Sequence, residues 1–245
     1  MTDMKLNILL CDRFPGLLPE YIPSYASMFV RLFERNCDDF SYTITDVLDG
    51  ELPSSDDDSD VYLVTGSNNG VYEDIPWIRN LLEWIRARAS SCTCREQVGK
   101  GLIVGICFGH QAVAQALGGR VEKAPVGWGT GIRESKVTGE EGLRWFPSGV
   151  MRLMYNHHDQ VVQLPEGAKV FASSDFCPVD GFTFGDNVIT FQGHPEYVPE
   201  YAVHLIMDFA DDEPMEVRTA ALRSIGNMQH DGDTVARWIT ARVSG

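Results

Sequence analysis

The sequence predicts an α/β fold: a doubly wound, mostly parallel sheet with a small antiparallel insertion and C-terminal helices. Three observations support this fold class. Short apolar runs alternate with helical patterns along the first half of the chain, as they do in parallel sheets. Between residues 101 and 117 an apolar run leads through a glycine-flanked turn directly into a helical pattern. Beyond residue 127 the apolar segments are separated only by turns, which is typical of antiparallel strands.

The first half of the chain supplies parallel strands and the helices between them. Strands are predicted at residues 6–10, 41–46 and 61–64, and a helix at Tyr21–Glu34. Pro76 opens a second helix, because proline is favoured at the first helical position. The apolar residues of this helix recur at steps of three and four, so we assign them to the core: Ile78, Leu81, Leu82, Ile85 and Ala89.

The second half supplies the antiparallel insertion, one further strand and the C-terminal helices. Short strands are predicted at residues 127–137, 150–155, 168–172 and 179–184, and a last strand at 188–192. Helical patterns cover residues 200–210, 217–225 and 234–243. Because no repeat or second boundary is visible, we expect a single domain over residues 1–245. Its core would be about 6–209, and its helical extension, about 210–245, would cap the sheet or dock another subunit.

A cysteine stands at the apex of the predicted strand, turn and helix. Gly105 and Gly109 lie two residues before and after Cys107 and permit a tight turn with close packing, as in a nucleophile elbow. Backbone N–H groups at the start of the helix favour a thiolate and can bind a developing negative charge. Most free cysteines are simply packed in the interior. The turn, and not the cysteine alone, therefore predicts a nucleophile.

A histidine and a carboxylate follow a strand far downstream. The strand at 188–192 runs directly into Gly193-His194-Pro195-Glu196. His194 can take the thiol proton and later protonate a leaving amine, while Glu196 can orient the imidazole and stabilise its charged form. Cys107, His194 and Glu196 are therefore the predicted catalytic residues.

Taken together, these motifs resemble the class I (triad) glutamine amidotransferase family, which has a Cys-His-Glu triad. The segments that carry the resemblance are GICFGHQ at 105–111, GHPE at 193–196, YNHHDQV at 155–161 and TGS at 65–67. With residues 71–78, the last segment is most similar to stand-alone members related to the amidotransferase half of GMP synthase. The resemblance spans roughly residues 6–209 and implies a flavodoxin-like arrangement of the sheet.

The resemblance implies glutamine as substrate. Cys107 would attack the side-chain carboxamide of glutamine and form a γ-glutamyl thioester while ammonia departs, and water would then release glutamate. By the same match, the oxyanion hole and the substrate contacts would come from Gly66 or Ser67, Phe108, Gln111, Tyr155, Asn156 and His157. The first three would offer backbone N–H groups to the oxyanion, Gln111 would contact the glutamine, and the stretch Tyr155–His157 would hold its amino-acid end.

Two departures from the family pattern bear on the substrate. Ser67-Asn68 stands where many relatives have Gly-Pro, and His158 stands where GMP synthase has glycine. Both leave the predicted nucleophile untouched.

Charge and composition limit the partners. The chain has 20 basic and 35 acidic residues, and a net charge of −15 would repel a nucleic-acid backbone. No apolar run reaches the ~18 residues that span a bilayer, and the N-terminus does not resemble a signal peptide, so no membrane association is expected and the cytoplasm is the predicted compartment. The acidic run at 56–60 is expected to be a solvated loop, with no metal or cofactor.

The remaining cysteines lack the spacing of a disulfide framework or a zinc site, and we interpret them as structural: Cys11, Cys37, Cys92, Cys94 and Cys177. A phosphate loop of the Walker type is also missing from the sequence, so an ATP-driven acceptor half is not on this chain.

Three functions are consistent with these patterns. The first is a glutamine amidotransferase acting as a glutaminase, with ammonia passed to an unknown acceptor by way of a synthase subunit. The second is a stand-alone γ-glutamyl peptidase or hydrolase, because the same triad would open any γ-glutamyl amide. The third is a non-enzymatic protein whose cysteine senses redox state. The presence of both His194 and Glu196 argues against the third, because a sensor needs no histidine–carboxylate pair.

Overall fold

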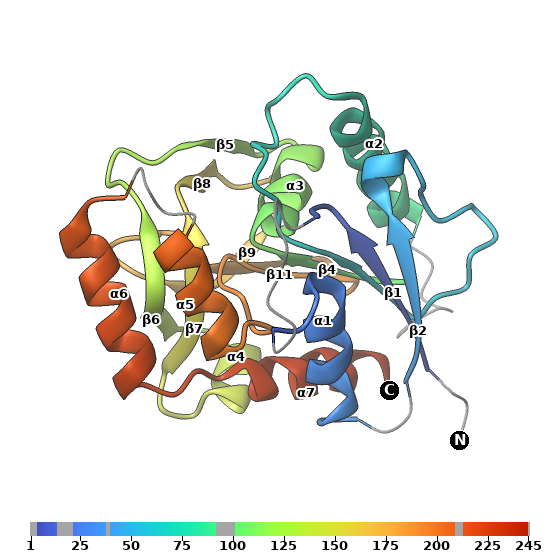
Figure 1. Cartoon of the computed structure of the whole chain (residues 1–245). Coiled ribbons are helices and arrows are strands. Elements are labelled where there is room, and N and C mark those ends of the chain that lie inside the picture. Colours follow the sequence, from blue (N-terminus) through green and yellow to red (C-terminus); the bar gives the residue numbers. More distant parts are fainter. Residues whose placement is uncertain (1–3, 14–21, 38–39, 92–100, 209–212, 245) are drawn as a thin grey trace.

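A computed structural model of the chain describes residues 4–13, 22–37, 40–91, 101–208 and 213–244 (Figure 1). Its main sheet has nine strands in the order β2-β1-β3-β4-β11-β10-β9-β6-β7. The first five of these form the parallel half: β1 (Met4–Leu10), β2 (Phe40–Asp46), β3 (Val61–Val64), β4 (Leu102–Ile106) and β11 (Val188–Phe191). The antiparallel half consists of β6 (Gly129–Val137), β7 (Val150–His157), β9 (Lys169–Ser173) and β10 (Gly181–Phe184).

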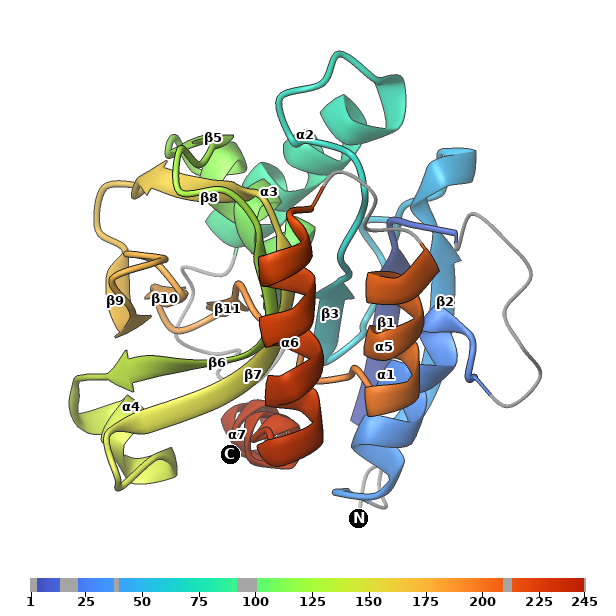
Figure 2. The same cartoon turned by 60° about the vertical axis from the view of Figure 1, so that its left-hand side comes forward.

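Helices cover both faces of the sheet. One face packs against α1 (Tyr25–Glu34), α5 (Pro199–Asp208) and α7 (Gly232–Val243), and the other against α2 (Pro76–Ser91) and α3 (Phe108–Ala116). The remaining helical segments are a 3₁₀ turn at Val47–Asp49, α4 (Glu140–Trp145) and α6 (Met215–Asn227). Figure 2 shows α6 beside α5, where it also lies against β6.

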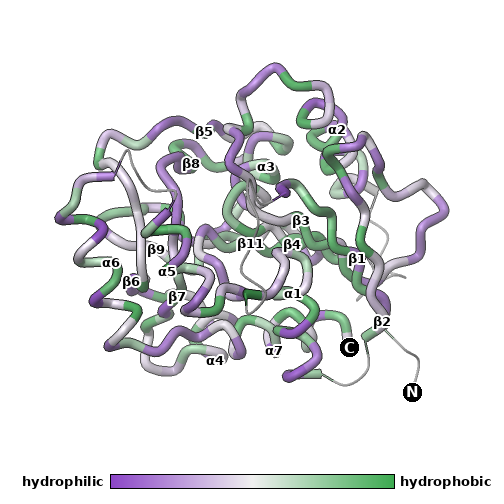
Figure 3. Tube along the Cα trace, in the orientation of Figure 1, coloured by the Kyte–Doolittle hydropathy of each residue, from purple (hydrophilic) through white to green (hydrophobic). Residues whose placement is uncertain are grey.

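The parallel strands separate two apolar clusters because successive side chains of a strand point to opposite faces. On β1, Leu6 and Ile8 belong to the cluster under α1 and α7, whereas Leu9 belongs to the cluster under α2 and α3. Strand β3 alternates in the same way. Figure 3 shows hydrophobic colour along the central strands, and hydrophobic and hydrophilic colours alternating along the helices.

The C-terminal helices complete the core beneath the sheet. Trp238 of α7 is 1% exposed and packs edge-on against Phe171 of β9 and Phe191 of β11, with ring centroids 4.8 and 5.7 Å away. This packing agrees with the predicted cap. That residues 1–245 form a single domain stays a prediction, which the same packing supports.

The predicted fold class is confirmed, and some element bounds differ from those predicted. Helix α1 begins at Tyr25 and not at Tyr21, because the Ser24 hydroxyl caps it by accepting the Ser27 N–H. The antiparallel insertion does not stand apart, since its strands extend the main sheet. The sequence patterns missed α4 and a separate ribbon of β5 (Arg120–Lys123) and β8 (Asp159–Gln163). Several positions used in the predictions lie outside the described residues: Tyr21, Cys92, Cys94, Phe209, Ala210 and the two chain ends.

The topology brings three of the sequence motifs to one edge of the sheet. Strand β4 is central, with β3 on one side and β11 on the other, and all three are parallel. Val64 pairs with Gly105, and Phe191 pairs with Ile106, so the three strands end level with one another. Ligands of open α/β sheets bind at this carboxyl edge.

Candidate active site

Cys107 occupies the turn between β4 and α3 with a strained backbone. Its φ and ψ are 52° and −104°, and among the described residues it alone combines a side chain with a positive φ. The strain is held in place on both sides. The Cys107 N–H donates to Phe191 O at 2.9 Å, and the Gly109 N–H donates to Thr65 O at 3.1 Å. The turn is thus fixed to β11 and to the end of β3.

The glycines around Cys107 are required by close packing. A Cβ on Gly109 would lie 2.1 Å from Val64 O, and a Cβ on Gly105 would lie 2.6 Å from Gly109 O. Any side chain at either position would therefore push α3 away from the sheet. This is the physical reason for the Gly-x-Cys-x-Gly pattern, which is typical of a nucleophile elbow.

His194 and Glu196 form a buried pair directly after β11. The imidazole Nδ1–H donates to Glu196 Oε1 at 2.7 Å, and the two side chains are 2% and 0% exposed. The His194 N–H donates to Met154 O at 2.7 Å, which fixes the backbone of the histidine against β7. The Glu196 hydrogen bond therefore sets which edge of the imidazole faces the carboxylate, and Nε2 makes no hydrogen bond with any described residue.

The charges around His194 favour its protonated form. Burial alone would lower its pKa, but the negative charges of Glu196 and Cys107 outweigh burial and raise the pKa to about 10. The thiol and Nε2 do not meet hydrogen-bond geometry, so their contact is electrostatic in this structure. Catalytic hydrogen bonds commonly tighten only when substrate is bound. The arrangement can hold a thiolate beside an imidazolium.

Gln192, the residue between β11 and Gly193, also contacts the thiol. Its side-chain Nε2 donates to Cys107 Sγ at 3.7 Å, and its Oε1 accepts from Gln111 Nε2 at 3.1 Å. An amide donor therefore lies within hydrogen-bond reach of the sulfur. Gln192 was not among the predicted site residues, although its place at a strand end two residues before His194 was a usable signal.

The glycine-rich segment after β3 meets Cys107 and His194 at Gly66. A Cβ on Gly66 would lie 2.5 Å from Tyr25 Oη, 3.0 Å from His194 Cε1 and 3.6 Å from Cys107 Cβ. The Gly66 N–H donates to Tyr25 Oη at 2.9 Å. Of the two predicted oxyanion donors on this segment, the Gly66 N–H is therefore occupied, whereas the neighbouring Ser67 lines the pocket.

The Phe108 N–H lies at the start of α3. No side chain caps this helix, and the Phe108 N–H makes no hydrogen bond with the described residues. The Phe108 ring points into the core, where it packs 5.5 Å from Trp77 between ring centroids. Only the backbone of Phe108 therefore remains as a candidate contact.

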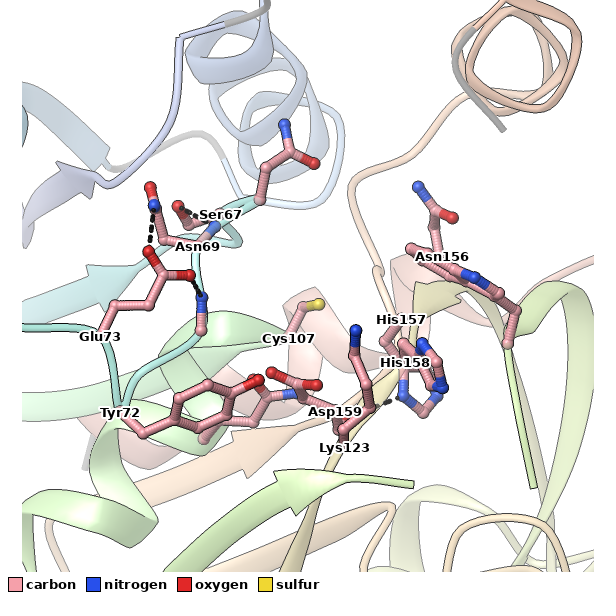
Figure 4. A pocket seen from close by; sticks show the side chains of 14 residues that line it. Ser67, Asn69, Tyr72, Glu73, Cys107, Lys123, Asn156, His157, His158 and Asp159 are labelled. Carbon is pink, nitrogen blue, oxygen red and sulfur yellow. Dashed lines mark hydrogen bonds between the residues drawn. The ribbon is translucent and has the colours of Figure 1, made fainter. Parts of the chain in front are cut away.

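A cavity of about 290 Å³ opens beside Cys107 between two walls (Figure 4). Figure 4 shows Ser67, Asn69 and Glu73 of the β3–α2 loop on one side and Asn156, His157 and His158 on the other. The complete lining is Ser67, Asn68, Asn69, Gly70, Tyr72, Glu73, Cys107, Gln111, Lys123, Trp128, Asn156, His157, His158 and Asp159. Pockets of this kind, with a few convergent polar groups, are the usual form of a small-molecule site.

The loop wall is held by its own hydrogen bonds. The Glu73 carboxylate accepts from the Gly70 N–H at 2.6 Å and from Asn69 Nδ2 at 2.9 Å. At the start of the loop, Asp12 accepts the Asn68 N–H at 2.8 Å. The loop is therefore tied at both ends.

The opposite wall comes from β5, β7, β8 and the turn before β6. Lys123 ends β5, and in the β5–β8 ribbon it pairs with Asp159. Trp128 packs on His158 with ring centroids 5.3 Å apart. The Tyr72 hydroxyl from the loop wall approaches the Asp159 carboxylate, as Figure 4 shows. Acidic, basic and aromatic groups are thus all present within one cavity.

Three of the four residues predicted to contact substrate line this pocket. Gln111 is there, with its Nε2 donating to Asp159 O at 2.8 Å, and so are Asn156 and His157. Tyr155 is not. Its side chain is 3% exposed, and its hydroxyl pairs with Ser135 Oγ at 2.9 Å inside the sheet, because alternate residues of β7 face opposite sides. Its assignment to the substrate stays a prediction that this placement does not support.

His157 is a poor rival to His194 as a base. Burial lowers its pKa to about 3, and no carboxylate side chain offsets that burial. Its Nδ1–H donates to Asp159 O at 3.1 Å, which leaves Nε2 as an unpaired acceptor. His157 is therefore a neutral hydrogen-bonding group.

The structure also bears on the other cysteines and on metals. Burial raises the thiol pKa of Cys11 and of Cys177, which disfavours a thiolate at either position.

Within the described ranges, no group of three or more His, Cys, Asp or Glu residues could hold a metal ion. No helix in the described part of the chain has the length and apolar character needed to cross a membrane.

Besides Gln192, sequence reasoning missed the pocket residues Tyr72, Lys123 and Trp128 and the Gly66 partner Tyr25. Lys123 and Trp128 flank a loop that comes to the pocket only through the β5–β8 ribbon, so no local pattern marked them. Tyr25 lies on a helix of ordinary amphipathic character, where an aromatic residue normally indicates core packing.

Comparisons with known proteins agree with these observations. The family described as "Glutamine amidotransferase class-I" matches residues 86–211, about half of the chain. "Gamma-glutamyl peptidase 3" of Arabidopsis thaliana is 29% identical over 80% of this chain and 82% of its own length. A subunit of the glutamine-hydrolysing GMP synthase of Halobacterium salinarum is 28% identical over 69% of this chain and 83% of its own length.

Solved structures show the same fold. A crystal structure of a glutamine amidotransferase from Thermotoga maritima superimposes with a TM-score of 0.73 at 18% identity, and the match covers all of both chains. Sequence family, fold and the placement of the motifs at one edge of the sheet lead to a single conclusion. This chain belongs to the class I glutamine amidotransferase family.

Proposed function

We propose that this chain hydrolyses the amide bond of a γ-glutamyl substrate through a thioester on Cys107. The observation that carries the proposal is the strained Cys107 turn beside the buried His194–Glu196 pair, at the edge of a polar cavity. Such a nucleophile, oriented base and adjoining polar pocket together constitute the arrangement needed for acyl transfer.

The reaction divides between the proposed residues as follows. The Cys107 thiolate attacks the γ-carbonyl carbon, and the carbonyl oxygen takes the negative charge. As the C–N bond breaks, the His194 imidazolium gives its proton to the leaving nitrogen, and Glu196 holds the ring in place. Water then attacks the thioester with His194 as base. The C–S bond breaks, glutamate leaves, and the thiolate–imidazolium pair is restored because His194 keeps the proton that it took from the water.

The oxyanion would be bound by the Ser67 and Phe108 N–H groups. Gly66 is the weaker candidate, because its N–H already donates to Tyr25. Phe108 supplies the N–H at an uncapped helix start, where partial positive charge favours an anion. Removing one oxyanion donor typically costs about 10²–10³ in kcat.

The amino-acid end of the substrate would lie against the pocket wall formed by β5, β7 and β8, which we call the antiparallel wall. We assign Gln111, Asn156 and His157 to it, because all three line the pocket. Because burial keeps His157 neutral, it would not repel the ammonium group of the substrate. Lys123 supplies the positive charge that an α-carboxylate requires.

Glutamine is the first candidate substrate, with ammonia passed through a synthase partner to an acceptor. A γ-glutamyl peptide is the second. It is favoured by the pocket rim, where Tyr72 is 52% exposed and Trp128 offers an aromatic face, so that a leaving group larger than ammonia finds apolar surface. The name of the Arabidopsis relative points to the same substrate class.

One comparison of rates separates the two substrates. The kcat/KM of the purified chain is measured for glutamine, γ-glutamyl dipeptides and glutathione. A hundredfold preference for a dipeptide, worth about 2.7 kcal/mol of transition-state binding, would establish a peptidase. Slow glutamine hydrolysis that a synthase partner accelerates would establish an amidotransferase. If no γ-glutamyl amide is cleaved and a glutamine-like chloroketone fails to label Cys107, the proposed function is wrong.

A further inference from the structure

Three tyrosines form a buried group behind the candidate catalytic residues. This tyrosine cluster consists of Tyr25 on α1, Tyr197 directly after Glu196, and Tyr201 on α5, and each is at most 7% exposed. The Tyr197 and Tyr201 ring centroids are 4.8 Å apart, and the Tyr25 and Tyr201 rings are stacked at 6.1 Å. None of the three belongs to the described pocket lining, so the cluster does not contact the substrate space directly.

The cluster touches two parts of the candidate machinery. The Tyr197 ring lies face to face with the His194 imidazole, with centroids 3.9 Å apart and an angle of 13° between the planes. The Tyr25 hydroxyl accepts the Gly66 N–H at 2.9 Å, next to the candidate oxyanion segment. Residues from α1, α5 and the β11–α5 loop thus meet at the base and at the oxyanion segment together.

We propose that Tyr197 is the positioning residue of the base: its ring face holds the His194 imidazole parallel to itself and stabilises the charged imidazolium. This inference rests on the proposed function in so far as His194 acts as the base. A cation over the face of a tyrosine ring is attracted by the negative π surface, and most strongly where water is excluded. His194 is 2% exposed, so water is excluded from its contact with Tyr197.

Glu196 and Tyr197 contact different sides of the His194 imidazole. Glu196 binds the edge of the ring at Nδ1, which sets the rotation within the ring plane. A hydrogen bond at one edge leaves the tilt of the plane free, and the parallel Tyr197 ring removes that freedom. The two neighbours therefore fix different degrees of freedom and both favour the cation.

Other titratable groups surround His194 and its two neighbours. On packed elements these are Cys107, Tyr25, Tyr201, His157, Asp12 and His230. Tyr197 differs from all of them in that its ring stacks on the imidazole within 4 Å. A change confined to the Tyr197 ring should therefore act on His194 through that contact.

The test is a titration of His194 that needs no substrate. The chain has six histidines, and ¹⁵N-histidine NMR can follow each of them, with His194 assigned by the signal lost in His194→Gln. Tyr197→Leu should lower the His194 pKa by about one unit. Tyr197→Phe keeps the ring face and should leave this pKa nearly unchanged. If Tyr197→Leu does not fold, Tyr197→Met removes the ring with a more adaptable side chain.

Tyr201→Leu is the matched control. Tyr201 belongs to the same cluster and is equally buried, but it packs on Tyr197 and not on His194. We expect it to reduce stability without shifting the His194 pKa. An equal shift in Tyr201→Leu, or a Tyr197→Phe shift as large as that of Tyr197→Leu, would overturn the inference, because loosened packing or the hydroxyl would then be the cause.

Kinetics provide a second readout. Tyr197→Leu should lower kcat about tenfold with little change in KM, because the base acts in the chemical step and does not bind substrate. Tyr197→Phe should restore kcat to within about twofold. If the enzyme is active but Tyr197→Leu leaves the His194 pKa unchanged, the positioning role is refuted and the proposed function is not. A chain that cleaves no γ-glutamyl amide but shows the ring-dependent pKa would refute the proposed function and leave the stacking role intact.

Discussion

The parallel and antiparallel halves of the sheet contribute to the site in different ways. In the parallel half, three neighbouring strands end level with one another. The segment directly after each strand carries a candidate group: Ser67, Cys107 and His194. In the antiparallel half, pocket residues come from strands and from a separate ribbon, and their side chains converge only when these pieces assemble. The candidate reacting groups are thus positioned by the local backbone, and the candidate substrate contacts by long-range packing.

The sharpest test of this division is the removal of the thiol. Cys107→Ala should reduce kcat by at least about 10⁴-fold and leave the fold unchanged, since it removes the nucleophile and little volume. Circular dichroism and turnover of a γ-glutamyl amide check both parts. Cys37→Ala, at a partly buried cysteine away from the pocket, is the control and should keep full activity. A glutamine-like chloroketone should label Cys107 alone, and an adduct on another cysteine would contradict the assignment.

The second test asks which half supplies the base. His194→Ala should lower kcat about 10³-fold or more, and Glu196→Gln less, because the carboxylate only orients the ring. His157→Ala should act mainly on KM, since burial holds the His157 pKa near about 3 and leaves it neutral above that pH. Steady-state kinetics between about pH 5 and pH 9 separate these effects. Near-normal kcat in His194→Ala would move the base to the antiparallel half.

The third test concerns the stability of the protein at the carboxyl edge of the parallel strands, where Asp12 follows β1. In the folded protein burial raises the pKa of Asp12 from 3.8 to about 6, although the backbone N–H groups of Asn68 and Arg13 oppose the shift. Ionising Asp12 therefore costs stability: the cost is absent below about pH 3.8 and complete above about pH 6. Asp12→Asn should raise the free energy of unfolding by about 3 kcal/mol near pH 8.

The same variant should leave unfolding almost unchanged near about pH 3.5, because the carboxyl is then largely neutral in both states. Urea unfolding at the two pH values is the measurement. Asn can still accept the Asn68 N–H, so the loop contact is retained. A gain that is equal at both pH values would show that burial of the charge is not the cause.

The smallest expected effect comes from the antiparallel wall. Lys123→Gln removes the positive charge of that wall and should raise KM about tenfold with kcat nearly unchanged, because it weakens ground-state and transition-state binding alike. Arg120→Gln, on the same strand but outside the pocket lining, is the matched control. A fall in kcat without a change in KM would mean that Lys123 acts on the reacting atoms.

The division between the halves also explains what the sequence could predict. Cys107 and His194 follow directly from strand ends and glycine spacing, which are local patterns, whereas the role of Ser67 was implied by the family resemblance. Tyr155 was predicted to contact substrate by resemblance alone, and the β7 register turns its side chain to Ser135. Asn156, the next residue, lines the pocket instead. A one-residue alternation in an antiparallel strand cannot be read without knowing which face is covered.

Other groups had no local signal at all. Tyr25 and Gly66 are 41 positions apart in sequence, and nothing at either position indicates their hydrogen bond. The β5–β8 ribbon, which brings Lys123 and Asp159 together, was missed because its strands, RVEK and DQVVQ, are mostly polar and form no apolar run. Both features depend on the assembled sheet.

The Glu73 hydrogen bonds to Asn69 and Gly70 have a consequence for the time course of binding. A loop whose shape is already set needs no ordering step when a ligand arrives, so little conformational entropy is lost on association. Encounter and docking, and not closure of a lid, should then determine the on-rate. Stopped-flow fluorescence from Trp128 at the rim should show a single phase whose rate rises linearly with ligand concentration. A rate that levels off would reveal an opening step in this loop.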